Sequence, residues 1–355
     1  MKPPSGPEPA NSLDCPLPLG PDDRLLLAHG EGARLSRKLI RDLMLQAFDN
    51  PYLRPLSDGS LLPPLAESLD LTTDCYVVSP LFFPGGDIGK LAVHGTVNDL
   101  AVCGAEALYL SVGMILEEGL PLETLRRVVK SMAEAARKRG VSIVTGDTKV
   151  VPKGAADGMF INTTGLGKLR PDCDLGPHRV QVGDRILVSG TLADHGMTIL
   201  ACREGLEFEG DLHSDTASLQ DLAADLLGQV PGLRFLRDPT RGGVAAVCHE
   251  LAEAGQISIQ LEESTLPVRS PTRAACELLG IDPLFVANEG KLLAVVAAEQ
   301  VEDALKVLRR HSQGTEAVCI GTILPREIVP VQVLNSLGRL RSLDEPSGAP
   351  LPRIC

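Results

Sequence analysis

Several common sequence patterns are missing from this chain, and each absence excludes a class of protein. No run approaches the 18 apolar residues of a membrane-spanning helix, so we expect no membrane segment. The N-terminus has no basic segment followed by an apolar one, so no secretory signal is expected. The nine cysteines form no Cys-x-x-Cys pair and no zinc-binding spacing. We therefore expect reduced thiols and a cytoplasmic location.

Nucleotide-binding and hydrolase signatures are also absent. Neither Gly-x-x-x-x-Gly-Lys-[Ser/Thr] nor Gly-x-Gly-x-x-Gly occurs, which argues against the P-loop and dinucleotide-binding folds. No local Ser–His–Asp arrangement is visible. Lys and Arg number 34 against 46 Asp and Glu, and the resulting net charge of −12 argues against nucleic acid as a partner. An acidic balance suits a site for divalent cations and, equally, the surface of an ordinary soluble enzyme.

Alternating strand and helix patterns fill most of the 355 residues, a length that exceeds one typical core. We therefore predict an α/β (α+β) protein with two domains, at residues 25–170 and 171–338. Six prolines among the first 20 residues predict a disordered leader over residues 1–24. Prolines and a glycine near the other end predict an extended, mobile tail over residues 339–355.

Three stretches of the first domain carry candidate chemistry. Asp74 lies inside a predicted strand over residues 69–78, where it either faces water at an edge or binds a metal. A helix is predicted to begin near Asp87, a good N-cap residue, and Lys90 on this helix is either solvated or close to a phosphate. The polar run 145–149 directly follows a predicted buried strand, and α/β proteins place their sites at such strand ends.

Two segments of the second domain have the same character. Asp238 stands in the run Arg-Asp-Pro-Thr-Arg-Gly-Gly, a tight helix entry suited to an anion. Glu289 precedes an apolar strand and is either a turn residue or a functional one. Carboxylate oxygens beside glycine backbones suit Mg²⁺ and a nucleotide phosphate. The inventory therefore favours a nucleotide site with Mg²⁺.

The last residue of the sequence is a cysteine, Cys355, at the end of the predicted tail. Two interpretations are open for it. A frayed end would make the thiol incidental. A mobile strap would instead offer the thiol to a partner and then draw it back into a pocket.

Six runs of the chain resemble, in order, the HypE family of hydrogenase maturation proteins. The resemblance covers the chain from about residue 28 to 355, and the six runs are SPLFFPGGDIGKLAVHGTVNDLAVCGA, VTGDTKVV, FINTTGLG, RDPTRGG, DPLFVANEGK and PRIC. This family of carbamoyl dehydratases is related to aminoimidazole ribonucleotide synthetase, selenophosphate synthetase and thiamine-monophosphate kinase, which lack the terminal cysteine. One departure is Ala33, in HGEGAR, which stands where the family usually has a second glycine.

The resemblance implies a fold and a reaction. The fold is the two-domain aminoimidazole ribonucleotide synthetase-like fold, in a homodimer that pairs its N-terminal sheets, with ATP in the cleft between domains. The carbamoyltransferase HypF is expected to place a carbamoyl group on the terminal cysteine. ATP-dependent dehydration would then convert this thiocarboxamide to a thiocyanate. The cyanide would pass to iron on the HypC–HypD complex and become a ligand of [NiFe]-hydrogenase.

Roles for individual residues follow from the resemblance and from the chemistry. Phosphoryl transfer depends on positioning and on charge neutralisation, so the predicted Mg²⁺ ligands are Asp74, Asp99, Asp147 and Asp238. The predicted ATP contacts are Asp87, Lys90, Asn98, Asp99, Gly146 and Thr148. Three residues are predicted to be catalytic. Cys355 would carry the carbamoyl group, and Glu289 would be the base that removes the amide proton. Lys149 would be an orienting residue or an alternative base. Lys90 or Lys149 would stabilise the transferring phosphate.

Two rival functions remain open. Another ATP-dependent enzyme of the superfamily, such as a selenophosphate synthetase, would need a reactive cysteine near the N-terminus, and Cys15 in the proline-rich leader is a poor candidate. A catalytically impaired scaffold for HypC–HypD is the second rival, since Ala33 alters the expected phosphate loop.

Overall fold

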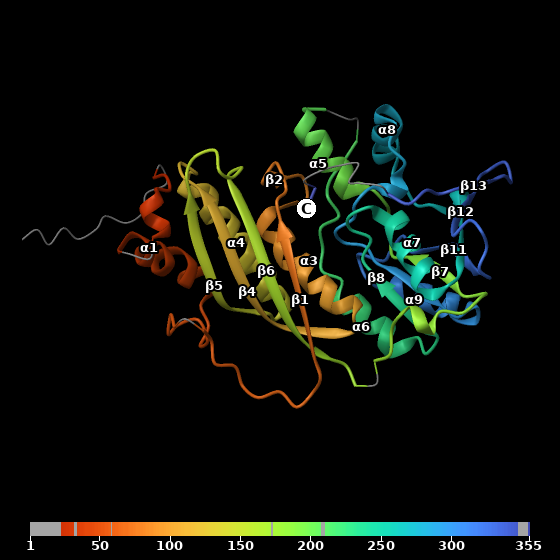
Figure 1. Ribbon diagram of the computed structural model, residues 1–355, viewed down its shortest axis with the longest axis horizontal. Helices are drawn as coiled ribbons and strands as arrows, with labels where there is room; N and C mark the ends of the chain where they lie inside the picture. The colour runs from red at the N-terminus through yellow and green to blue at the C-terminus, as the bar shows by residue number, and fades with distance from the viewer. Residues whose placement is uncertain (1–22, 32–33, 58, 172, 207–209, 347–353) are drawn as a thin grey trace, which may run out of the picture.

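Two β-sheets, one in each half of the chain, organise the computed structural model (Figure 1). The structure describes residues 23–31, 34–57, 59–171, 173–206, 210–346 and 354–355. The predicted leader therefore lies outside the described residues except for its last two, and Ala33 lies outside them as well.

The first sheet has four strands in the order β1-β6-β4-β5, with β4 and β5 parallel and the other neighbours antiparallel. Its strands are β1 (Leu69–Tyr76), β4 (Ala105–Glu117), β5 (Ser142–Val151) and β6 (Met159–Leu169). A short hairpin of β2 (Phe82–Phe83) and β3 (Gly86–Asp87) lies between β1 and the first long helix. The sequence predicts either a strand pair or one bent strand over residues 69–78, and the structure has a single strand there, β1, which ends at Tyr76.

The second sheet has seven strands in the order β13-β12-β9-β11-β7-β10-β8, and only β12 and β9 are parallel. Its strands are β7 (Arg185–Val188), β8 (Leu233–Arg237), β9 (Ser258–Glu262), β10 (Leu293–Val296), β11 (Val318–Leu324), β12 (Val331–Leu334) and β13 (Leu340–Ser342). Strands β7, β10 and β11 are rich in Val, Ile and Leu, which suits the buried centre of a sheet.

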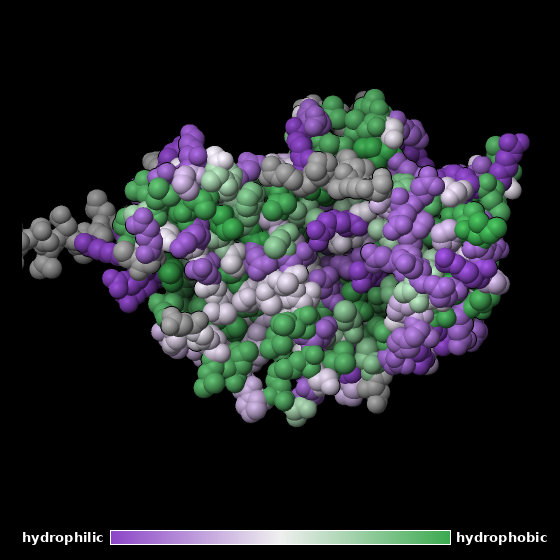
Figure 2. Space-filling view, in the orientation of Figure 1, coloured by the Kyte–Doolittle hydropathy of each residue, from purple (hydrophilic) through white to green (hydrophobic). Residues whose placement is uncertain are grey.

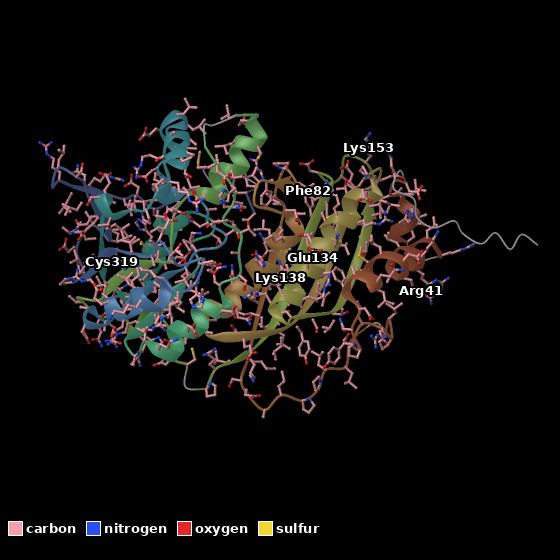
Figure 3. All side chains as sticks on the ribbon, turned by 180° about the vertical axis from the view of Figure 1, so that it is seen from behind. Arg41, Phe82, Glu134, Lys138, Lys153 and Cys319 are labelled. Carbon is pink, nitrogen blue, oxygen red and sulfur yellow. The ribbon has the colours of Figure 1, made fainter. Side chains whose placement is uncertain are left out.

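Helices cover both sheets (Figure 1). In the first half they are α1 (Arg34–Leu39), the π-helical turn Ile40–Leu45, α2 (Gln46–Phe48), α3 (Ile88–Val102) and α4 (Leu122–Arg139). In the second half they are α5 (Asp194–Glu204), α6 (Gln220–Gln229), α7 (Gly243–Gly255), α8 (Ser270–Leu279) and α9 (Val301–Leu308). Seen from behind, α4 carries Glu134 and Lys138 on its outer face (Figure 3).

Helix α3 is buried on all sides, because it lies between the first sheet and the second half of the chain. Of its 15 residues, 13 are buried. Asp87 caps its N-terminus as predicted: Oδ1 accepts from the main-chain N–H groups of Gly89 at 2.8 Å and Lys90 at 3.1 Å. The Ser131 hydroxyl donates to Oδ2 at 2.6 Å and ties the cap to α4. Both oxygens of Asp87 therefore serve the helix start.

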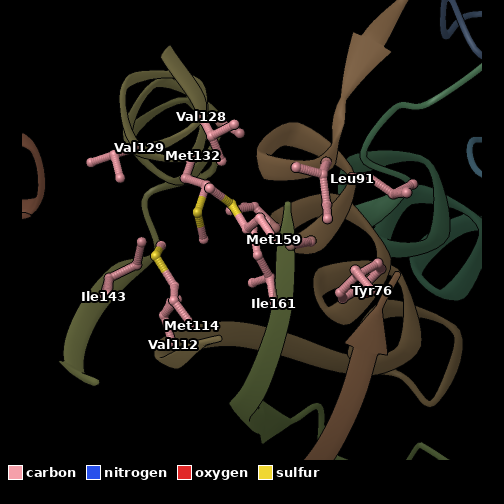
Figure 4. Close-up of a cluster of buried hydrophobic side chains, with 14 of the residues drawn as sticks. Tyr76, Leu91, Val112, Met114, Val128, Val129, Met132, Ile143, Met159 and Ile161 are labelled. Atoms are coloured by element: carbon pink, nitrogen blue, oxygen red, sulfur yellow. The ribbon is translucent and has the colours of Figure 1, made fainter. Parts of the chain in front are cut away.

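The core of the first half fills the space between α3, α4 and the sheet (Figure 4). Met132 from α4 meets Met114 and Met159 from the strands there, and all three side chains are buried. Unbranched Met side chains fill irregular gaps, which suits the space between a twisted sheet and two helices.

The polar run 145–149 does not form the predicted loop, because it lies inside strand β5. Parallel pairing with β4 continues through it, with Asp147 opposite Gly113. A Cβ at Gly146 would lie 2.4 Å from the carbonyl oxygen of Val112, so this glycine lets the two strands approach. A Gly-Asp pair often marks a turn, and here the pairing with a long neighbouring strand keeps it extended.

The tail also begins later than predicted. Residues 340–342 form β13, which pairs with β12, and Leu343 is buried in the core of the second half. Residues 347–353 lie outside the described residues, and the chain is described again at Ile354 and Cys355. This end lies between the two halves, near the start of α5 (Figure 1).

One face of the first sheet packs against α3 and α4, and the described helices leave the other face uncovered (Figure 1). Leu69, Leu71 and Ile115 are exposed on this face. Asp147 and Lys149 project from it too, because they alternate along β5 with the side chains that face the helices. The space-filling view shows hydrophobic residues beside weakly polar ones on this side of the molecule (Figure 2).

In the described parts of the chain, no helix has both the length and the apolar character needed to cross a bilayer.

Gly95 allows α3 to pack against β1, because a Cβ at this position would lie 2.2 Å from the hydroxyl oxygen of buried Tyr76. We expect Gly95→Ala to lower the free energy of unfolding by about 1–3 kcal/mol, measured by urea denaturation. Gly228 in α6 is the matched control, since a Cβ there meets nothing within 4 Å. Gly228→Ala should leave stability unchanged or raise it by up to about 1 kcal/mol. Equal effects of the two changes would contradict this packing.

Candidate active site between the two halves

Four carboxylates from distant parts of the sequence meet between the two halves of the molecule. Asp74 comes from β1, Asp99 from α3, Asp238 from the loop after β8, and Glu289 from the segment before β10. They are close enough to affect one another's ionisation, and the charges of Asp74 and Asp99 help to raise the pKa values of both Asp238 and Glu289. Three of the four predicted Mg²⁺ ligands and the predicted base are thus brought together.

We call the region around these four carboxylates, between the two halves, the cleft; Asp74 and Asp99 are its half-buried members. The alternation of β1 turns Thr72 and Asp74 toward α3, and the Thr72 hydroxyl donates to Oδ2 of Asp99 at 2.9 Å. Partial burial, followed by repulsion from Asp74, raises the pKa of Asp99. Nη2 of Arg241 lies 3.5 Å from Oδ1 of Asp74, and the Arg241 side chain is largely exposed, so a positive charge stands beside this carboxylate.

Asp238 is buried deeper than the other two aspartates. Burial raises the pKa of its carboxyl from 3.8 to about 7, and the charges of Asp99 and Asp74 add to this effect. The carboxylate is therefore costly to ionise unless a cation enters the cleft.

Glu289 has a buried carboxyl oxygen, Oε1, that lacks a hydrogen-bond partner among the described residues. Burial and the four neighbouring aspartates raise its pKa well above 4.5, with Asp238 the largest electrostatic contributor. A buried carboxyl with a raised pKa and an unpaired oxygen is typical of a catalytic acid or base.

Asp215 and Lys291 form a buried ion pair behind Glu289, and the sequence did not reveal either as a site residue. Nζ of Lys291 lies 3.3 Å from Oδ2 of Asp215, at ion-pair distance although without hydrogen-bond geometry. Oδ1 of Asp215 accepts from the main-chain N–H of Glu289 at 3.0 Å. The two residues are far apart in sequence, so no local pattern could have linked them.

The end of the chain lies in the same cleft. Ile354 is buried, and the main-chain oxygen of Cys355 accepts from the N–H of Val77 at 3.1 Å. Burial, followed by the charge of Glu289, raises the pKa of the Cys355 thiol to about 12. The thiol is therefore neutral and lies near the buried carboxyl.

Three residues predicted to contact ATP make hydrogen bonds within the fold, and their contact with ATP stays a prediction. Asp87 caps α3, as described above, and Nζ of Lys90 donates to the carbonyl oxygen of Gly85 at 2.9 Å near that helix start. Nine residues of α3, or about 13 Å along the helix axis, separate Lys90 from Asp99 and so from the carboxylates. The side-chain amide of Asn98 is buried and donates both hydrogens to main-chain oxygens of the second half, so it has no free donor for a nucleotide.

The β5 residues lie apart from the carboxylates in this chain. Asp147 on β5 pairs with Gly113 on the next strand, β4. Across the rest of the sheet, Gly113 pairs with Asn162 on β6, and Asn162 pairs with Cys75 on β1. Asp147 is therefore three strand spacings, about 14 Å, from β1, the strand that carries Asp74. Beside β5 a pocket of about 690 Å³ is lined by Gly146, Asp147 and Thr148 together with basic and aromatic residues of the N-terminal segment, including Arg37, Arg41, Phe48, Tyr52 and Arg54.

The cleft suits a phosphate-bound Mg²⁺ better than an ion held by protein alone. In the described residues, no three His, Cys, Asp or Glu side chains converge closely enough to hold a metal ion by themselves. Mg²⁺ usually takes one or two protein carboxylates and completes its shell with water and phosphate oxygens. The mutual repulsion of Asp74, Asp99 and Asp238 is the feature that such a cation would relieve.

We expect Asp238→Asn to stabilise the protein at pH 8. The unfolded carboxyl ionises near 3.8 and the folded one near 7, so this group makes folding progressively less favourable between those values. Removing the charge should therefore raise the free energy of unfolding by up to roughly 4 kcal/mol at pH 8 and by much less at pH 5. Urea denaturation at both pH values measures the difference.

Asp211→Asn is the control for this measurement, because the Asp211 carboxylate is exposed. It should change stability by less than about 0.5 kcal/mol at either pH. Destabilisation of the Asp238→Asn protein at pH 8 would show that the ionised carboxylate is not repelled in this cleft.

Comparison with known proteins places these residues in a family. The model of the AIR synthase related protein N-terminal domain matches residues 58–169, and that of the C-terminal domain matches residues 181–333. Carbamoyl dehydratase HypE of Azotobacter vinelandii is 51% identical over 331 residues, which cover 93% of this chain and 96% of that protein.

Solved structures agree with this result. A crystal structure of hydrogenase maturation protein HypE in complex with ATP matches with a TM-score of 0.89 and 48% identity, over 93% of this chain and 100% of that one. A HypE–HypF complex matches with a TM-score of 0.76 and 45% identity, over 87% of this chain and 99% of that one. With this identity over both sheets and the cleft between them, the chain belongs to the HypE family of carbamoyl dehydratases and has the AIR synthase-related fold.

Proposed function

We propose that this protein dehydrates a carbamoyl group carried on the thiol of Cys355, and that the resulting thiocyanate supplies the cyanide ligand for the iron of [NiFe]-hydrogenase. Membership of the HypE family supports this reaction. The observation that carries the proposal is the position of Cys355, which is docked between the two halves near Glu289. A thiocarboxamide on this sulfur would lie within the cleft that holds the carboxylates.

The reaction converts R–S–C(=O)NH₂ and ATP to R–S–C≡N, ADP and phosphate. When bound, Mg²⁺–ATP supplies the phosphoryl group that makes the amide oxygen a good leaving group. The likeness to a HypE structure solved with ATP supports this substrate. One or two of Asp74, Asp99 and Asp238 would hold the Mg²⁺, with phosphate oxygens and water as its other ligands. Arg241, beside Asp74, would contact phosphate oxygens.

Glu289 is our candidate for the base that removes the amide protons. Its unpaired, buried oxygen is available to accept a proton. Its raised pKa makes the ionised form a stronger base than an ordinary glutamate. Asp215 holds the main chain of Glu289 in place. Lys149, the predicted alternative base, lies on β5 away from Cys355 in the same chain.

Partners are implied by the position of the thiol. Because Cys355 is mostly buried when docked, the tail must leave the cleft before the thiol can accept a carbamoyl group. HypF is the proposed donor, which the likeness to a HypE chain in complex with HypF supports. The HypC–HypD complex is the proposed acceptor of the cyanide. The eight cysteines of the described residues are all free, which is compatible with a reducing cytoplasm.

A homodimer would use the uncovered face of the first sheet. Leu69, Leu71 and Ile115 are exposed on this face, and burying apolar side chains of this kind favours association. The same face carries Asp147 and Lys149, so face-to-face pairing of two sheets would bring these residues to the interface between the copies. Their predicted contacts with Mg²⁺ and ATP would then be made across that interface.

The proposal is tested by the mass of the intact protein. After treatment with HypF, carbamoyl phosphate and ATP, we expect a gain of one carbamoyl group, and further ATP with Mg²⁺ should then remove one water. Cys355→Ala should show neither change. Glu289→Gln should gain the carbamoyl group and keep it, because the base is missing. Chelation of Mg²⁺ with EDTA should also stop the loss of water.

The pH dependence of the second step gives an independent check. Glu289 must be ionised to act as a base, so the loss of water should slow as pH falls through its raised pKa, above the range of an ordinary glutamate. A carbamoyl gain without any loss of water in the wild type would favour a carrier or scaffold. The absence of any gain would leave only the family assignment.

We expect Leu71→Asp to convert the dimer to a monomer, because it places a charge on the uncovered sheet face. Leu278→Asp on α8 is the matched control, since the two side chains are 67% and 68% exposed. Light scattering after size-exclusion chromatography measures the mass of each variant. A monomeric wild type, or a Leu71→Asp protein that stays dimeric, would contradict association through this face.

A further inference from the structure

The end of the chain is held in the cleft from both halves of the molecule. The N–H of Val77, just after β1, donates to the main-chain oxygen of Cys355 at 3.1 Å. Nε2 of His195, at the start of α5, lies 2.9 Å from the carbonyl oxygen of Ile354. The Ile354 side chain is buried in a hydrophobic cluster to which both halves contribute. These contacts make a built site for the last two residues.

The hydrogen bonds around His195 determine which atom is the donor in the His195–Ile354 bond. A carbonyl oxygen can only accept, so Nε2 of His195 carries the hydrogen and donates it. Burial lowers the pKa of His195, which keeps the imidazole neutral and leaves Nδ1 as an acceptor. The Ser214 hydroxyl, 2.8 Å away, therefore donates to Nδ1, while Ser214 Oγ accepts from the N–H of Thr216 at 3.1 Å. Both ring nitrogens of His195 therefore have a hydrogen-bond partner.

The main chain just before His195 is hydrogen-bonded to the segment that carries Glu289. The N–H of Ala193, two residues before His195, donates to Oδ1 of Asn288 at 2.9 Å. Ala193 has a φ of 70°, in the left-handed region that is unfavourable for residues with a Cβ. The ring of Phe83 packs edge-on against the imidazole, with the ring centres 5.6 Å apart. The position of His195 relative to Glu289 is therefore set by several contacts.

The geometry points to His195 as a positioning residue that holds the Ile354 carbonyl and so sets the Cys355 thiol against Glu289 for dehydration. This inference rests on the proposed roles of Cys355 and Glu289. Transfer of the carbamoyl group to the thiol requires a released tail, and dehydration requires a docked one. Loss of the His195–Ile354 hydrogen bond should therefore affect the two steps differently.

The experiment compares wild type with three variants of the full-length protein. His195→Ala removes the bond, and His195→Gln offers an amide donor in place of Nε2. His249→Ala is the matched control, because Nε2 of His249 lies 2.8 Å from the carbonyl oxygen of Leu343 and makes the same type of bond outside the cleft. Three rates are measured by mass spectrometry: alkylation of Cys355 by iodoacetamide, carbamoyl gain with HypF, and loss of water with ATP and Mg²⁺.

For His195→Ala we expect alkylation of Cys355 to be about tenfold faster and loss of water about tenfold slower, since one buried hydrogen bond is removed. Carbamoyl gain should be unchanged or faster. His195→Gln should recover part of both effects, and His249→Ala should match the wild type. A general defect in folding would slow carbamoyl gain as well, so it does not reproduce this pattern.

Wild-type rates of alkylation and water loss in His195→Ala would overturn the inference. So would a parallel loss of carbamoyl gain and water loss that His195→Gln fails to recover, because His195 would then only support the fold. If the wild type neither gains a carbamoyl group nor loses water, the proposed function fails instead. The alkylation comparison does not depend on that function, so it still tests the hold of His195 on the tail.

Discussion

Asn98 joins the two halves of the molecule, and the geometry of the cleft depends on that junction. Its amide donates to the carbonyl oxygens of Ala217 at 3.0 Å and Glu289 at 3.4 Å, and its Oδ1 accepts from the N–H of Leu219 at 2.8 Å. The bonds to Glu289 and Leu219 are buried, and a buried group left without its hydrogen bond costs about 1–3 kcal/mol. The next residue, Asp99, is thereby placed where the two halves meet.

The cleft built around this junction is unfavourable electrostatically without a ligand. Asp74, Asp99 and Asp238 repel one another in a region that excludes much of the water. Nearby, Asp215 is paired with Lys291, so the fold neutralises a buried carboxylate where its role is structural. Unpaired buried charge is characteristic of functional sites, where stability is lost so that a ligand can be bound. A cation and an anionic nucleotide together would satisfy both the aspartates and Arg241.

Local patterns predicted the elements well where one residue decides the backbone. Asp87 at the start of α3 is such a position, because its side chain accepts hydrogen bonds from N–H groups of the first turn. The same local reasoning was wrong for residues 145–149, because a long parallel neighbour keeps a Gly-Asp pair extended. It also placed the start of the tail too early, since β13 is stabilised by pairing with β12 rather than by its own residues.

The family, the two-part α/β organisation and most of the carboxylates that meet between the two halves could be predicted from the sequence, because these depend on residue identity and order. Which polar side chains lie close together could not be predicted in this way, because that depends on how distant segments pack in the folded chain. Asp87 and Asn98 carry the same kinds of chemical group as the predicted ligand Asp99, and the structure shows that both make hydrogen bonds that hold the fold together. Asp215, Lys291 and His195 joined the site only through folding, because the contacts that define them link residues far apart along the chain.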